Sequence, residues 1–202
     1  MSLSAYVLLC YCPIVTITLC NGKGGSGKTT LSILLAWALT EAGHDVAVLD
    51  TDPQKTASRW IQETGGLQLA EEGKSYTALL IDTPPSLDSA AVRKAVRSAN
   101  AVIVVTSPSP ADLFTSRDTA EMIRGESLQG RAFLLFNQVQ PGTVLARDLD
   151  GMAERIGLPS LKNRLQRRQA YQHAAVVGWK SLPMEAREEV FKVALEITAL
   201  AR

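Results

Sequence analysis

The sequence predicts an α/β protein with a doubly wound, mostly parallel sheet and helices on both faces of that sheet. Short runs of β-branched and other apolar residues alternate along the chain with longer segments of helical periodicity. The short runs are apolar throughout, as in strands that are covered on both faces. A glycine-rich segment joins the first run to the first helical segment, and aspartates end two further runs. These three observations together predict the fold class.

The expected strands and helices follow one another in strict alternation. Apolar runs predict strands at 14–19, 46–50, 78–82, 101–106 and 132–137. Helical spacing predicts helices at 29–42, 56–63, 89–98 and 111–124, with glycines at 43, 65, 66 and 125 ending three of them. Helical spacing recurs from Leu145 to Ile156, a basic stretch follows, and a last helix is expected at 184–202. No linker or repeat interrupts this order, so we expect residues 14–202 to form a single domain.

Composition and cysteine content exclude several classes of protein. With 46% hydrophobic and 20% charged residues, the 202-residue chain is neither disordered nor collagenous. Its cysteines, Cys10, Cys12 and Cys20, fit neither a disulfide framework nor a zinc site built from cysteine pairs, so we expect a cytoplasmic protein. Residues 1–13 contain no basic residue and are interpreted as an appended segment rather than a secretory signal.

A phosphate-binding loop is predicted where the first strand meets the first helix. The segment GKGGSGKT, residues 22–29, fits G-x-x-x-x-G-K-[ST] in the strand–loop–helix context that this motif requires. Its glycines let backbone N–H groups turn toward phosphate oxygens, and the helix N-terminus adds positive potential. Lys28 is expected to contact the β- and γ-phosphates, and Thr29 to ligate Mg²⁺. The nucleotide-binding residues expected from the loop are Gly22, Lys23, Gly24, Gly25, Ser26, Gly27, Lys28, Thr29 and Thr30.

Three aspartates are expected at the same edge of the sheet as this loop. Asp82 ends the apolar run of LLIDTPPS, where a Walker B aspartate stands to hold magnesium. Asp50 and Asp52 follow the run before it. A single aspartate at such a position is often a helix cap, whereas three at the carboxyl edge of an open α/β sheet favour a ligand site.

Four motifs together resemble the ParA/MinD family of deviant Walker A ATPases, and in particular its small plasmid-partition members of the ParF type. They are KGGSGKTT at 23–30, DTDPQ at 50–54, IDTPP at 81–85 and TSPSP at 106–110. The resemblance extends from about residue 14 to the C-terminus. It implies a P-loop ATPase that uses ATP and Mg²⁺, dimerises around ATP and works with a cargo-bound partner that stimulates hydrolysis.

The resemblance also implies roles for individual residues. Lys23 would be the family's second loop lysine, which reaches the phosphates of the partner subunit and makes nucleotide binding and dimerisation one event. Lys23, Lys28 and Asp52 would then be catalytic, with Asp52 orienting the attacking water. Asp50 would support the magnesium shell formed by Thr29 and Asp82. Candidates for the adenine pocket and the dimer face are Pro108, Pro110 and Asn137.

A local basic segment predicts a DNA-binding surface. Between Arg155 and Met184 there are six basic residues and no Asp or Glu. A few contacts from such a segment to backbone phosphates are enough for binding without sequence specificity. The segment also resembles the DNA-contacting region of partition ATPases, which makes its best candidates Lys162, Arg164, Arg167 and Arg168. The competing interpretation is a solvated basic face that serves solubility alone.

Three functions remain open within this fold. The favoured one is a nucleoid-associated switch that segregates plasmid or chromosome DNA through a centromere-binding protein, or spaces a protein cargo such as carboxysomes as McdA-like relatives do. A MinD-like membrane ATPase is less favoured, because the last helix is rich in Glu and would be repelled by anionic lipid. A metabolic ligase resembling dethiobiotin synthetase would need a substrate pocket, and no further cluster of acids, bases or nucleophiles marks one.

Overall fold

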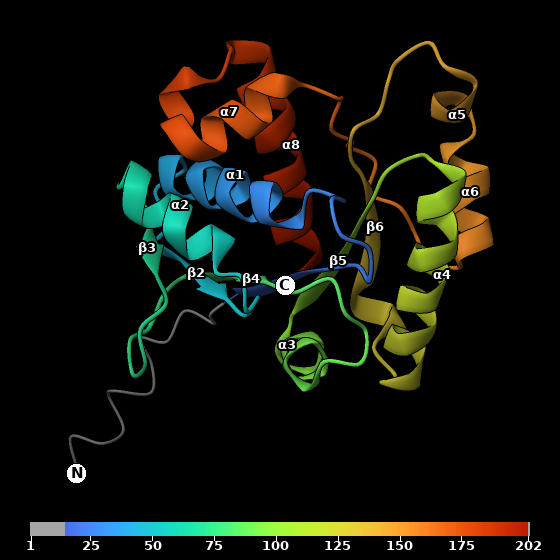
Figure 1. The fold of residues 1–202 in the computed structure, drawn as a ribbon, viewed down its shortest axis with the longest axis horizontal. Coiled ribbons are helices and arrows are strands. Elements are labelled where there is room, and N and C mark those ends of the chain that lie inside the picture. The colour runs from blue at the N-terminus through green and yellow to red at the C-terminus, as the bar shows by residue number, and fades with distance from the viewer. Residues whose placement is uncertain (1–14, 202) are drawn as a thin grey trace.

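A six-stranded parallel sheet forms the centre of the molecule (Figure 1). The computed structural model describes residues 15–201. The strands are β1 (Val15–Cys20), β2 (Val46–Asp50), β3 (Gln68–Leu69), β4 (Ala78–Asp82), β5 (Ala101–Thr106) and β6 (Ala132–Phe136). Their order is β3-β2-β4-β1-β5-β6, and every paired strand is parallel to its neighbour. The α/β, doubly wound fold class is therefore confirmed.

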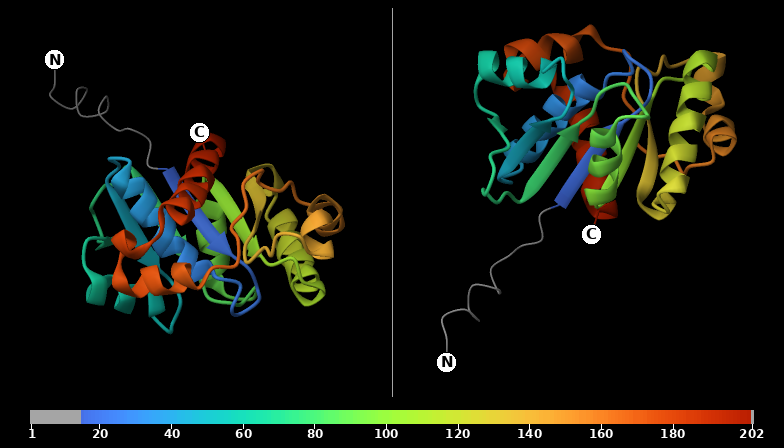
Figure 2. Two further views of the ribbon diagram at one scale, coloured as in Figure 1. Left: turned by 90° about the horizontal axis from the view of Figure 1, so that it is seen from above. Right: turned by 60° about the horizontal axis from the view of Figure 1, so that its bottom comes forward.

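Helices cover both faces of this sheet (Figure 2). One face carries α1 (Lys28–Glu41), α2 (Thr56–Thr64), α7 (Gln169–Val177) and α8 (Met184–Leu200), whose apolar side chains form one core cluster with the sheet. The other face carries α3 (Ala90–Ser98), α4 (Pro110–Gly125) and α6 (Leu149–Ile156), which form a second cluster. The short helix α5 (Val144–Arg147) and the 3₁₀ turns η3 (Gln129–Arg131) and η4 (Trp179–Ser181) complete the chain. The sheet is thus buried on both sides, as its apolar strands require.

Helix α1 is buried around most of its circumference. It packs against β2 and β4 on one side and against α2, α7 and α8 on the others. Leu31, Ile33, Leu34 and Leu35 are each at most 1% exposed, although they point in different directions around the helix. Because α1 begins at Lys28, this packing fixes the position of the phosphate-binding loop.

The expected strands and helices are found with shifts of only a few residues, but two details differ. Gly43, Gly65 and Gly66 end their helices with positive φ as expected. Gly125, by contrast, is still helical, and the left-handed residue after α4 is Ser127 with φ 58°, so the expected end at Gly125 was wrong. The expected segment from Leu145 to Ile156 is divided into α5 and α6 at Asp148.

Two elements were not predicted from the sequence. The edge strand β3 has only two residues, too few for an apolar run. Helix α7 lies within the basic stretch, where it buries Tyr171, Ala174 and Ala175. The interpretation of residues 1–13 as an appended segment concerns residues outside the described part of the chain. Within residues 15–201, no helix is both long and apolar enough to cross a membrane.

Candidate nucleotide site and basic surface

The phosphate-binding loop lies at the carboxyl edge of the sheet, between β1 and α1. Gly25 and Gly27 have φ values of 77° and 96°, a region that only glycine enters readily. A Cβ atom at Gly27 would collide with the amide of Asn137. That amide donates to the carbonyl of Ser26 at 2.9 Å, and the Gln138 amide donates to the carbonyl of Gly25 at 3.2 Å. The residues after β6 therefore hold the loop in its open turn.

The two lysines of the loop occupy different environments. Lys28 is buried, and its Nζ donates to the carbonyl of Lys23 at 3.0 Å, so the ammonium group lies inside the turn of the loop. Burial lowers the pKa of Lys28, and the charges of Asp82 and Asp52 oppose that effect. Lys23 is 39% exposed and forms an ion pair with Asp112 at the start of α4. Only Lys28 is therefore in place to contact a nucleotide bound in its own chain.

The surroundings of Asp112 keep its carboxylate in place for this ion pair. Its side chain is 4% exposed, and it accepts hydrogen bonds from the Ser107 hydroxyl at 2.7 Å and the Ser107 N–H at 3.3 Å. Burial alone would raise the pKa of Asp112, but the hydrogen bonds from Lys23, Ser107 and Ser109 outweigh it and hold the pKa below its ordinary value. Asp112 is a site residue that the sequence did not single out, since its partner lies 89 positions away.

Asp82 and Thr29 form the part of the site that fits a magnesium ion. The Thr29 hydroxyl donates to Asp82 Oδ2 at 2.8 Å, and the Ser32 hydroxyl donates to Oδ1 at 3.2 Å. Burial and the charge of Asp50 raise the pKa of Asp82, whereas the hydroxyls of Thr29 and Ser32 and the charge of Lys28 lower it; the net result is a pKa of about 6. A buried carboxylate beside a hydroxyl at the phosphate loop is the oxygen-donor set that Mg²⁺ takes together with phosphate oxygens and water. The residues present therefore fit the ion.

Asp50 and Asp52 lie at the same edge but have different contacts. Asp50 is opposite Asp82 in the register of β2 and β4. Its carboxylate accepts hydrogen bonds from the N–H of Asp52 at 3.0 Å and from the N–H and hydroxyl of Ser58, each at 2.9 Å. Asp52 is half-buried and accepts from the Gln54 N–H at 2.9 Å. Asp50 thus fixes the turn that carries Asp52 toward the loop.

Among residues 15–201, no three His, Cys, Asp or Glu side chains gather closely enough to hold a metal by themselves. Magnesium in nucleotide sites is commonly held by one or two carboxylates together with substrate phosphates.

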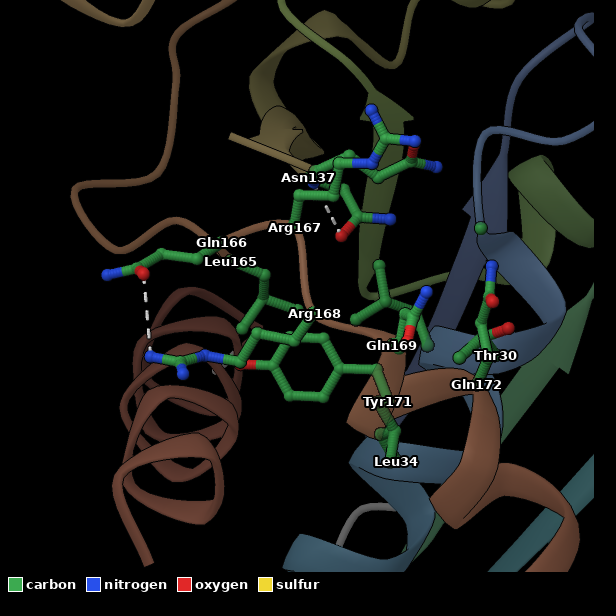
Figure 3. A pocket seen from close by; sticks show the side chains of 13 residues that line it. Thr30, Leu34, Asn137, Leu165, Gln166, Arg167, Arg168, Gln169, Tyr171 and Gln172 are labelled. Carbon is green, nitrogen blue, oxygen red and sulfur yellow. Dashed lines mark hydrogen bonds between the residues drawn. The ribbon is translucent and has the colours of Figure 1, made fainter. Parts of the chain in front are cut away.

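A cavity of about 200 Å³ opens beside the loop (Figure 3). Its walls come from the first turns of α1, from Asn137 and Gln138 after β6, and from α7. Of the three candidates for the adenine pocket and dimer face, Asn137 lines this cavity, whereas Pro108 lines a separate hollow and Pro110 begins α4. Tyr171 stands in the cavity wall because α7, a helix that the sequence did not predict, brings it there. The cavity is the candidate pocket for a nucleotide base.

Residues 160–168, here called the strap, run alongside β6 and pass over this cavity. The N–H groups of Leu161, Leu165 and Arg167 donate to carbonyls of Leu134, Phe136 and Val139 at 2.8, 3.0 and 2.9 Å. Two glutamates of α8 hold the strap from the other side. Glu196 accepts from the N–H groups of Lys162 and Asn163 at 2.7 and 2.9 Å, and Glu189 accepts from the Gln166 N–H at 3.2 Å.

The expected DNA-binding residues all lie on the strap, but they do not form one uniform group. Lys162, Arg164 and Arg167 are exposed and have no ion-pair partner within the described residues 15–201. Arg168 is half-buried beside Tyr171 (Figure 3). It forms an ion pair with Glu189 at 2.5 Å. Three of the four side chains are therefore available to an external phosphate.

Comparison with known proteins identifies the family. The model of the CobQ/CobB/MinD/ParA nucleotide binding domain matches residues 17–178. The chain is 30% identical over 194 residues to "Maintenance of carboxysome distribution protein A" of Halothiobacillus neapolitanus, covering 85% of this chain and 88% of that protein. The protein of the same name from Gloeobacter kilaueensis is 32% identical over 177 residues, covering 80% and 81%.

Solved structures show the same fold. A plasmid partition protein of Borrelia burgdorferi bound to AMPPNP superposes with a TM-score of 0.74 at 17% identity, covering 93% of this chain and 99% of that one. A Cyanothece McdA(D38A)–ATP complex superposes with a TM-score of 0.72 at 13% identity, covering 92% and 96%. With the family model matching most of its length, the chain belongs to the CobQ/CobB/MinD/ParA nucleotide-binding domain family, and within it to the P-loop ATPases of ParA/MinD type.

Proposed function

We propose that this chain is a positioning ATPase that dimerises around ATP and Mg²⁺, binds DNA without sequence specificity as a dimer, and distributes a cargo. A partner protein on the cargo would stimulate hydrolysis and return the chain to a monomer. The main observation behind the proposal is that the two lysines of one phosphate loop point in different directions. Lys28 lies inside the loop, whereas Lys23 points out of it toward Asp112, where a second subunit can approach.

The residues of the site have separate tasks in this cycle. Backbone N–H groups of the loop and Lys28 bind the phosphates, and Thr29 and Asp82 hold the metal. A magnesium ion held by Thr29 and Asp82 would supply positive charge to offset the charge that develops on the phosphates during hydrolysis. Asp52 orients the attacking water. Lys23 leaves Asp112 and contacts the phosphates bound by the partner subunit, so that the composite site is complete only in the dimer.

The strap supplies the DNA-binding surface. Its exposed cations, Lys162, Arg164 and Arg167, attract backbone phosphates, and binding of this kind has no sequence requirement. The alternative of a lipid-binding last helix has less support, because α8 turns its apolar face inward. Val190, Val193 and Ile197 are each 0% exposed in the core beneath α1. A cytoplasmic, nucleoid-associated protein follows from this proposal.

Two relatives support a protein cargo. The two relatives described above, which each match most of this chain, are named for carboxysome distribution. We therefore place a carboxysome-like cargo ahead of plasmid or chromosome DNA, which reverses the order expected from the sequence. Deleting the gene and imaging both kinds of cargo distinguishes these functions. If carboxysomes become clustered instead of evenly spread, a carboxysome-like cargo is supported. If plasmids are lost while carboxysomes stay normally distributed, a DNA cargo is supported.

The proposed switch is tested by fluorescence anisotropy of a labelled random-sequence DNA duplex. The protein is added with Mg-ATP, with Mg-ADP or without nucleotide. We expect binding that needs ATP, because only the dimer doubles the number of phosphate contacts. Equal binding in all three states would contradict the switch, and absence of binding in every state would make the strap a solvated face.

A further inference from the structure

A second hollow, of about 320 Å³, lies between the first half of the strap and the corner formed by α5 and α6. Cations from two separate segments line it: Arg147 from the end of α5, and Lys162 and Arg164 from the strap. The hydroxyl of Ser160 adds a hydrogen-bond donor, and Asp150 is the one carboxylate among the described residues that line it. We call this site, defined by Arg147, Asp150, Ser160, Lys162 and Arg164, the cationic hollow.

Within the described part of the chain, the three cations of the cationic hollow outnumber its single carboxylate, Asp150, and none of them is neutralised by an ion pair. None of them forms an ion pair within residues 15–201, whereas nearby arginines do: Arg155 pairs with Asp148, and Arg168 pairs with Glu189. Like charges around one hollow repel each other, and an anion between them relieves that repulsion. The site therefore favours an anionic ligand over a neutral or cationic one.

The backbone beneath the cationic hollow is fixed before any ligand binds. Glu196 accepts from the N–H groups of Lys162 and Asn163 at 2.7 and 2.9 Å, and the Leu161 N–H donates to the carbonyl of Leu134 at 2.8 Å. Arg147 is less tightly held, with one contact at 3.4 Å to the carbonyl of Gly142. Fixing the strap reduces the entropy lost when the strap cations order around an anion.

The contacts of the cationic hollow favour a phosphodiester over a nucleotide base. Phe136, which is 3% exposed, is the one aromatic among its described lining residues, so no aromatic face is offered for a base to stack on. The base pocket beside the phosphate loop uses the other half of the strap, from Leu165 onward, and shares no lining residue with the cationic hollow. The two sites are therefore separate and can be filled together.

We propose that the cationic hollow binds one backbone phosphate of DNA per chain, with Arg147 as a contact that complements Lys162 and Arg164. This inference rests on the DNA binding proposed above and adds the place of one phosphate and a residue outside the basic segment. Asp150 weakens the contact by repulsion and limits the affinity of each chain for DNA.

The test is the salt dependence of DNA affinity in Mg-ATP, measured by anisotropy for the wild type, Arg147→Ala and Asp150→Asn. Loss of one phosphate contact should make the slope of log affinity against log salt less negative by about 0.9 per chain and lower the affinity about five- to tenfold at 0.1 M salt. Asp150→Asn should bind more tightly than the wild type. Arg59→Ala, which removes an exposed arginine from the distant α2, is the matched control and should keep the wild-type slope.

The outcomes separate this inference from the proposed function. If the wild type binds no DNA in any nucleotide state, both fail together. If the wild type binds DNA and Arg164→Ala weakens it, while Arg147→Ala keeps the wild-type slope and affinity, the cationic hollow is wrong and the strap surface stands. Circular dichroism checks that Arg147→Ala folds. Should it not fold, Asp150→Asn decides, because unchanged or weaker binding by that variant overturns the inference.

Discussion

At the scale of single residues, the ion pair between Lys23 and Asp112 affects how readily the proposed dimer forms. In the proposed cycle Lys23 leaves Asp112 to reach a second subunit, so the ion pair would oppose dimerisation by the free energy that it contributes to the monomer. A pair with one partner 39% exposed contributes about 0.5–1 kcal/mol, because water and salt screen it. The ion pair therefore adjusts the dimerisation threshold without preventing the switch.

Asp112→Asn should lower the protein concentration at which ATP produces a dimer. The variant keeps an oxygen for the hydrogen bonds from Ser107 and removes the charge that holds Lys23. We expect a two- to fivefold lower dimer dissociation constant in saturating Mg-ATP, measured by sedimentation velocity. Asp118→Asn, which changes an exposed carboxylate on the same helix, is the control. An equal or higher dissociation constant for Asp112→Asn would contradict this role.

Site residues that belong to contiguous motifs could be predicted from the sequence. The glycines, Lys28 and Thr29 stand at fixed spacing because one loop must surround the phosphates. The partners of those residues could not be predicted, because they lie far away in the chain. Asn137 reaches Ser26 across 111 positions, and Asp112 reaches Lys23 across 89. Periodicity carries no information about such pairs.

At the scale of elements, α8 acts as the support of the strap. Glu189 and Glu196 are seven residues apart, about two helical turns, and so lie on the same side of the helix. Each carboxylate accepts a strap N–H, and Glu189 also accepts from the Tyr171 hydroxyl at 2.7 Å. Glu189 and Glu196 belong to the acidic residues of the last helix that made lipid binding less favoured, and they therefore have a structural role. They fix the segment that lines the base pocket and presents the cations.

Glu189→Gln should destabilise the protein in a pH-dependent way. Burial alone would raise the pKa of Glu189, but the hydrogen bonds from Arg168, Tyr171 and the Gln166 N–H outweigh it and lower the pKa from 4.5. A carboxyl group whose pKa is lowered by folding stabilises the protein at pH values above its ordinary pKa. That stabilisation is lost as the pH falls through the lowered pKa. We expect the free energy of unfolding of the variant at pH 7 to be about 1.5–3 kcal/mol lower than that of the wild type. This difference should shrink below pH 4.5.

Urea unfolding at pH 7, 5 and 3.5 measures this difference. Glu188→Gln is the matched control, because its exposed carboxylate pairs only loosely with Lys192, at 3.9 Å. That change should cost about 0.5 kcal/mol or less at any pH. Equal effects of the two substitutions would show that Glu189 does not support the strap.

Elements with a strong apolar pattern could be predicted from the sequence, and elements that depend on tertiary contacts could not. Strand β5 is apolar in all but its last residue, and each of its residues is at most 1% exposed. Helix α7 begins among charged and amide residues, and its helical state depends on packing against α1 and α2. Helix α5 has four residues, too few to show a period.

At the scale of the whole molecule, strand order explains why the site is where it is. β1 is central: it pairs with β4 on one side and with β5 on the other, while the chain itself runs from β1 through α1 to β2. A loop that leaves such a strand opens into the crevice where ligands bind in open α/β sheets. The order brings Asp82 from β4 and Lys23 after β1 to one edge together with Asp112 after β5. Local sequence patterns predict strands but not their neighbours, so this order had to come from the structure.

The central claim is that ATP binding and dimerisation are one event that depends on Lys23. The most direct test is the mass of Asp52→Ala in Mg-ATP, measured by light scattering coupled to size-exclusion chromatography. This variant should bind ATP without hydrolysing it, because the residue that orients water is absent. We predict twice the mass of one chain with ATP, the mass of one chain with ADP, and the mass of one chain for Lys23→Ala combined with Asp52→Ala in ATP. An Asp52→Ala protein that stays monomeric with ATP, or a double variant that still dimerises, would contradict the account.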